Sequence, residues 1–103
     1  MKRDVYELQP DSHDGRKSFY GKAKIAVVGN TRALKSYETI VAAVNEAGEV
    51  FRIWGGWSAT TARHVDSFVR SETGKPGISK KEWLEMPLYN WSWFTGNITP
   101  ASK

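Results

Sequence analysis

The segment from Ser36 to Phe68 limits the possible folds more than any other part of the chain. It begins with residue types that suit a pleated strand, passes through a glycine-containing loop at Asn45–Glu49, and returns as a second run at Val50–Trp54. A Gly-Gly pair follows, and after it apolar residues recur at helical spacing. A β-hairpin that leads into an amphipathic helix predicts an α+β domain, because the apolar stripe of the helix has to be buried against the sheet.

Three runs of residues predict a small antiparallel sheet of three or more strands. In Lys22–Val28, Ala23, Ile25 and Val27 fall on one face and Lys22 and Lys24 on the other. Gly29-Asn30 follows, a pair that is typical of a turn. The next strand is predicted as one element over about Leu34–Val44, and its weak alternation indicates a central strand covered on both faces. The hairpin centred on Asn45–Glu49 then leads to the third strand, and sequence order is the simplest topology.

Two helices are predicted after this sheet. The main helix extends over about Ser58–Glu72, where a serine and threonines at the start can cap the first turn and apolar residues form one stripe. A second, short helix is predicted over about Ser79–Met86, because Ser79 and Glu82 form the pattern of a capping box. The expected fold class is therefore α+β, with the sheet packed by one main helix and one short helix.

The length of 103 residues corresponds to a single domain. Residues 1–15 are expected to form a flexible or edge-docked arm, and residues 16–103 the α+β domain. The domain ends in a Trp-rich tail, which either adds an edge strand to the sheet or wraps the core as extended chain. The sequence has no cysteine, no apolar run long enough to span a bilayer and no apolar core after its basic start, so we expect a cytoplasmic protein.

Residues suited to catalysis are few. The two histidines are His13 and His64, and neither is accompanied by the convergent groups that nucleophilic catalysis or a metal site requires. We interpret His64 as a histidine at the helix surface or boundary that bonds to a threonine hydroxyl or a strand backbone, so its replacement by alanine should change stability only slightly. We therefore expect no enzyme activity, no catalytic residue, no bound metal and no cofactor.

A basic segment is the first candidate binding surface. The net charge is +4, and residues 16–35 include six basic side chains with no Asp or Glu among them. Nucleic acid phosphates bind surfaces of this kind. The alternative is a solvated strand face whose lysines protect the edge of the sheet. The six residues are Arg16, Lys17, Lys22, Lys24, Arg32 and Lys35.

The five tryptophans provide the second candidate surface. Because tryptophan buries a large apolar area, most of them are expected in the core of so small a domain. Trp57 and one of Trp91 and Trp93 are the best candidates for exposure, since they flank a loop and an irregular tail. Exposed tryptophans are typical anchors of protein interfaces and stacking platforms for nucleic acid bases.

Three motifs in the middle of the chain resemble a known family. They are RKSFYGKAKI at residues 16–25, SYETIVAAV at residues 36–44 and WSATTARHVDSFV at residues 57–69. In this order they resemble a family of small uncharacterised proteins that bacteriophages, prophages and plasmids encode. The resemblance implies a small α+β domain from a mobile genetic element, and it implies no established activity or ligand. The tail from Trp83 onward is not part of the pattern.

These observations favour a non-enzymatic binding module that contacts a host or viral macromolecule, most of all a protein, in the cytoplasm of a bacterial host. Such a module would inhibit a host process or a defence system, with Trp57, Trp91 and Trp93 as anchors. The alternative is a nucleic-acid-binding protein that uses the basic face from Arg16 to Lys35. A membrane partner is not expected, and the oligomeric state is left open.

Overall fold

The computed structural model describes residues 3–7 and 23–101 of the chain. Its main feature is a five-stranded antiparallel sheet in which neighbouring strands follow one another in sequence. The α+β prediction is confirmed, and the sheet has more strands than the minimum of three. Residues from the expected arm supply the first edge strand. The strands are β1 (Arg3–Glu7), β2 (Ala23–Val28), β3 (Thr31–Ser36), β4 (Thr39–Val44) and β5 (Val50–Arg52).

The turn between β3 and β4 differs from the prediction. The sequence predicts one strand over Leu34–Val44, whereas the structure ends β3 at Ser36 and starts β4 at Thr39. Tyr37 makes this turn in the left-handed region, with φ of 55°, which a residue with a side chain rarely adopts. The predicted hairpin at Asn45–Glu49 is confirmed, because β4 and β5 pair on either side of it.

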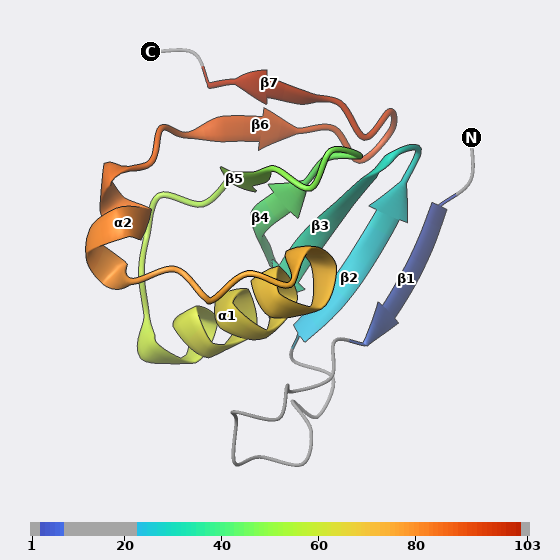
Figure 1. The fold of residues 1–103 in the computed structure, drawn as a ribbon. Helices are drawn as coiled ribbons and strands as arrows, with labels where there is room; N and C mark the ends of the chain where they lie inside the picture. Colours follow the sequence, from blue (N-terminus) through green and yellow to red (C-terminus); the bar gives the residue numbers. More distant parts are fainter. Residues whose placement is uncertain (1–2, 8–22, 102–103) are drawn as a thin grey trace.

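The main helix, α1 (Ala59–Thr73), lies across one face of the sheet (Figure 1). Its start is as predicted, since the Ser58 side chain accepts a hydrogen bond from the Thr61 N–H in the first turn. Gly74 ends the helix with φ of 75°. The predicted apolar stripe is buried against strand residues of the sheet, and together they form the core. This core includes Ile25, Leu34, Val41, Val65, Phe68 and Val69.

The second helix, α2 (Lys80–Glu85), carries the capping box that the sequence predicts between Ser79 and Glu82. Its Trp83 side chain is buried in the core, where the indole Nε1 donates a 2.7 Å hydrogen bond to the Gly56 carbonyl. Arg52 of β5 connects the end of this helix to the sheet. Its guanidinium donates to the carbonyls of Trp54, Gly55, Leu84 and Met86, and it lies 5.7 Å from the Trp83 ring centroid.

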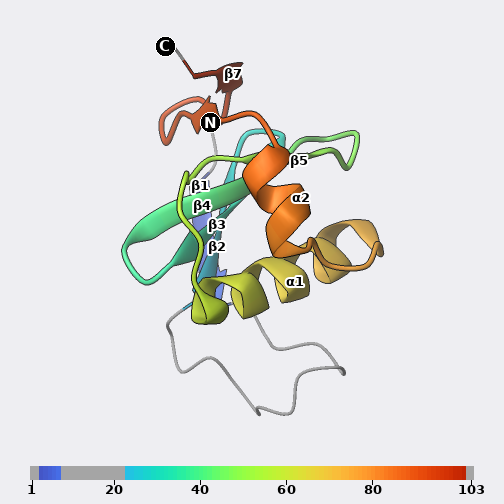
Figure 2. The same cartoon turned by 90° about the vertical axis from the view of Figure 1, so that its left-hand side faces the viewer.

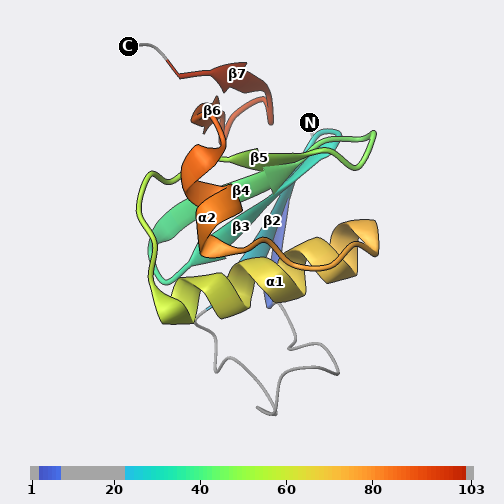
Figure 3. The same cartoon turned by 60° about the vertical axis from the view of Figure 1, so that its left-hand side comes forward.

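The C-terminal tail forms a hairpin of its own from β6 (Tyr89–Trp91) and β7 (Ile98–Pro100). It therefore neither extends the main sheet nor wraps the core as extended chain. A single parallel bridge between Arg52 and Leu88 connects the start of the tail to β5. Figures 2 and 3 show this hairpin at the opposite end of the molecule from α1.

The hairpin packs on the face of the sheet that points away from α1, which we call the second face. Ala26, Ala33 and Ala43 pair across β2, β3 and β4 on this face, and all three are buried. Phe51 follows in the same row, and its ring meets Tyr89 edge-on with centroids 4.8 Å apart. The sheet is thus covered by α1 on one face and contacted by the hairpin on the other.

Candidate functional site

Two exposed aromatic side chains are neighbours in the turn between β6 and β7. Trp93 is 40% exposed and Phe94 is 71% exposed. The ring of Trp91 meets that of Trp93 edge-on, with centroids 5.4 Å apart. We call Trp91, Trp93 and Phe94 the hairpin aromatic patch. The Ser92 hydroxyl oxygen holds the turn, because it accepts hydrogen bonds from the backbone N–H groups of Phe94 and Thr95.

A short chain of hydrogen bonds seats this patch on the sheet. The Trp91 indole Nε1 donates to the Thr31 hydroxyl at 3.0 Å, and that hydroxyl donates to the Gly96 carbonyl at 2.7 Å. Gly96 has φ of 78°, and a Cβ atom at this position would overlap the carbonyl oxygen of Val28. Only glycine allows such a close approach with this backbone conformation. The patch is therefore held in a defined position before any partner binds.

The three tryptophan anchors predicted from the sequence do not form one surface. Trp57 is half-buried and packs against the core beside Trp83, with ring centroids 6.3 Å apart. Trp91 and Trp93 lie together on the hairpin. Sequence reasoning missed Phe94, the most exposed of the large hydrophobic residues of the described chain. Its position beside a Thr-Gly-Asn turn was the available signal, since side chains at turn tips point outward.

The structure brings two of the six predicted basic residues together. Lys24 and Lys35 face each other across β2 and β3 on the second face, and both are half-buried. The Lys35 ammonium also lies 3.3 Å from the Glu38 carboxylate. Arg16, Lys17 and Lys22 lie outside the described residues.

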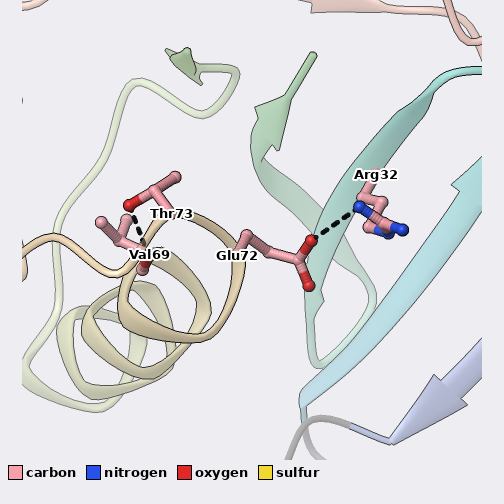
Figure 4. Close-up of polar contacts among 4 residues, drawn as sticks. All are labelled: Arg32, Val69, Glu72 and Thr73. Atoms are coloured by element: carbon pink, nitrogen blue, oxygen red, sulfur yellow. Dashed lines mark hydrogen bonds and ion pairs between the residues drawn. The ribbon is translucent and has the colours of Figure 1, made fainter. Parts of the chain in front are cut away.

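Arg32 is not part of that lysine pair. Its place in the register puts it opposite Val27 and Val44, on the face that α1 covers. There its Nη1 donates to the Glu72 Oε1 at 3.1 Å, near the last turn of α1, where the Thr73 hydroxyl donates to the Val69 carbonyl (Figure 4). The predicted single face that combines Arg32 with Lys24 and Lys35 is therefore divided between the two sides of the sheet.

His64 is placed differently from the prediction. Its side chain is buried, with 2% exposed, and its Nδ1 lies 2.8 Å from the Ser36 hydroxyl, which in turn lies 3.4 Å from the Thr61 hydroxyl. A serine beside a histidine resembles a nucleophile with its base, but Ser36 is also only 2% exposed, so a substrate cannot reach its oxygen. We interpret this buried cluster as a contact that holds α1 to β3. The described residues include no group of three His, Cys, Asp or Glu side chains that could hold a metal ion.

The buried cluster also joins two of the motifs noted in the sequence. Ser36 and Tyr37 come from the motif at residues 36–44, and Thr61 and His64 come from the motif at residues 57–69. The rings of Tyr37 and His64 have centroids 6.0 Å apart. The residues that carry the resemblance are therefore in contact where the main helix meets the β3–β4 turn.

Comparison with known proteins identifies the family. A family model described as a family of unknown function (DUF8033) matches residues 6–85. The chain belongs to this family. All three motifs lie within the match, whereas the match ends at the last residue of α2, before β6 and β7. The hairpin aromatic patch is thus an addition to the part of the chain that the family model covers.

Two further comparisons give no relative. No curated protein and no solved structure matches the chain. Within the described residues, neither α1 nor α2 has the length and apolar composition that crossing a membrane requires.

Proposed function

We propose that this protein is a non-enzymatic module that binds a protein partner through the hairpin aromatic patch. The observation that carries the proposal is the exposure of Trp93 and Phe94, at 40% and 71%, on a turn that hydrogen bonds fix to the sheet. Large exposed aromatic side chains are unfavourable in water unless a partner covers them, and tryptophan is enriched among the residues that dominate binding energy.

Preorganisation supports the same proposal. A partner that binds a fixed hairpin does not have to order it first, so less of the interaction energy is lost on binding. The patch lies beyond residues 6–85, so the partner would be particular to this chain or to its near relatives. The resemblance to proteins of phages, prophages and plasmids supports a host or viral protein as the partner, with inhibition of a host process or defence system as the result.

A nucleic acid is the second candidate partner, because one observation favours it. Lys24 and Lys35 lie on the second face, which is also the face that the hairpin contacts through Thr31 and Phe51. Aromatic side chains on the same face as lysines suit a single strand, whose bases stack while its phosphates meet the positive charges. Lys35 is already paired with Glu38, and the net charge of the chain is only +4, so this is the weaker proposal.

Affinity capture from a bacterial lysate distinguishes a protein partner from a nucleic acid partner. The immobilised full chain is incubated with lysate in the presence and absence of nuclease, and the bound proteins are quantified by mass spectrometry. The proposal predicts a partner that is retained after nuclease treatment and whose binding changes little between about 50 and 200 mM salt, since few phosphate contacts are involved. Loss of all specific partners on nuclease treatment would favour the nucleic acid.

A further inference from the structure

A groove at the junction of α1, α2 and β5 is separate from the hairpin aromatic patch. Its volume is about 760 Å³. The loop at residues 74–79 forms one wall, and the end of α2 forms another. The apolar lining comes from Val50, Val69, Ile78, Met86 and Pro87.

The loop wall is held in place before anything binds. The Asp66 carboxylate of α1 accepts a 3.1 Å hydrogen bond from the Ile78 N–H. A Cβ atom at Gly77 would overlap the same carboxylate, so the loop depends on glycine to pass this close to the helix. The backbone N–H of Lys75 donates to the Thr73 hydroxyl at the other end of the loop. These contacts indicate a groove that is already formed in the free protein.

The charges around the groove are unlike those of the whole chain. Glu82 and Glu85, both exposed, line it from α2, while Lys75 is the basic residue of the lining. The full chain has a net charge of +4. The lining therefore carries two carboxylates and one ammonium, and this surplus of negative charge beside apolar side chains favours a ligand that carries positive charge next to an apolar group.

We propose that this groove binds a basic peptide segment, in which one aliphatic side chain enters the apolar lining and neighbouring lysine or arginine side chains meet Glu82 and Glu85. This site is independent of the protein partner proposed for the hairpin aromatic patch. The open shape of the groove and the exposure of its charged side chains favour a peptide over a small metabolite.

Titration with a synthetic peptide tests the proposal. The probe is acetyl-Gly-Lys-Lys-Leu-Lys-Gly-amide, added to isotope-labelled full-length protein and followed by backbone amide NMR shifts. We expect saturable shifts at Ile78, Glu85 and Met86, with an affinity weaker than about 100 μM because a short peptide has a single anchor. The same peptide with glutamates in place of its lysines should bind at least about fivefold more weakly.

Matched variants test whether the lysine peptide binds at the groove. Glu85→Lys should weaken binding of the lysine peptide by about fivefold or more. Glu46→Lys, the same charge change at an exposed residue of the β4–β5 loop that does not line the groove, should leave it within about twofold. Trp93→Ser should leave peptide binding unchanged, which separates this site from the hairpin aromatic patch. Absence of shifts around the groove, equal binding of the two peptides, or equal weakening by Glu85→Lys and Glu46→Lys would overturn the proposal.

Discussion

The buried His64 helps to hold the main helix on the sheet. Its imidazole is 2% exposed and shares a hydrogen bond with Ser36, so it fills space between α1 and β3 and satisfies a buried hydroxyl. Burial gives this side chain a larger role in stability than a histidine at the helix surface would have. The prediction of a slight effect for its removal is therefore replaced.

We now expect His64→Ala to lower the free energy of unfolding by about 2–4 kcal/mol, because it leaves a cavity and removes a hydrogen-bond partner from Ser36. Urea denaturation followed by circular dichroism measures this loss. Thr60→Ala, an exposed change on the first turn of the same helix, is the control and should cost less than about 1 kcal/mol. Equal effects of the two substitutions would contradict a buried, bonded His64.

Arg52 is another polar residue that the fold buries, with 7% exposed. Its planar guanidinium donates hydrogen bonds to four carbonyls. The single ammonium group of a lysine cannot reproduce this arrangement of donors. We expect Arg52→Lys to destabilise the fold by about 2–4 kcal/mol, since a charge and several carbonyls stay buried with poorer partners.

Arg32→Lys is the matched comparison for Arg52→Lys. The Arg32 side chain is about half exposed and makes one ion pair, with Glu72, so this change should cost less than about 1 kcal/mol. Thermal unfolding of the two variants side by side gives the difference. If the two substitutions shift the melting temperature equally, the carbonyl contacts of Arg52 do not stabilise the end of α2.

At the level of elements, the hairpin of β6 and β7 depends on how closely Gly96 approaches the β2–β3 turn. We expect Gly96→Ala to release the hairpin from the second face, because the added methyl group overlaps the Val28 carbonyl. Hydrogen exchange should then increase in β6 and β7 while α1 stays protected.

Gly48→Ala separates this overlap from backbone strain. Gly48 has φ of 83°, close to that of Gly96, but a Cβ atom there meets no other atom within 4 Å. Gly48→Ala should therefore lower the free energy of unfolding only by the strain of a left-handed alanine, about 1–2 kcal/mol. Hydrogen exchange in β6 and β7 should stay unchanged. Faster exchange of the hairpin in both variants would show that the approach to Val28 does not hold it.

The elements that local signals define were predictable. The first turn of α1 follows from Ser58, the capping box of α2 from Ser79 and Glu82, and the β4–β5 hairpin from Gly48. Each signal acts within a few residues of chain, which is why sequence reasoning finds it. The turn at Tyr37 was missed because its residues are not typical turn formers, and contacts around the β3–β4 turn override their preference.

The features that depend on distant contacts were not predictable. Thr31 and Trp91 lie 60 residues apart in the sequence, so nothing near either residue indicates their hydrogen bond. The same holds for Ser36 and His64, which turn an expected surface histidine into a buried one. The separation of Arg32 from Lys35 follows from side-chain alternation along β3, and it was missed because the predicted strand over Leu34–Val44 did not include Arg32.

At the scale of the whole molecule, the chain combines a family domain with an addition. Residues 6–85 match the family, and they include the strands of the main sheet from β2 to β5, α1 and α2. The hairpin adds a second contact layer and the exposed aromatic patch. Because the proposed binding residues lie outside the matched region, we expect the domain to stay folded when they are replaced.

Binding through the hairpin aromatic patch is tested most directly by comparing two double variants and one single variant in the same lysate capture. Trp93→Ser with Phe94→Ser removes the exposed aromatics, Lys24→Glu with Lys35→Glu reverses the lysine pair, and Leu84→Ser removes another exposed apolar side chain, 48% exposed, from α2. Each variant is first shown to keep the wild-type circular dichroism spectrum.

We expect the aromatic variant to capture at least about tenfold less of the partner, because a few aromatic residues dominate such interfaces. The lysine reversal and Leu84→Ser should each change capture by less than about threefold at physiological salt. Capture that survives in the aromatic variant and disappears in the lysine variant would contradict the account and identify the lysine pair as the binding surface.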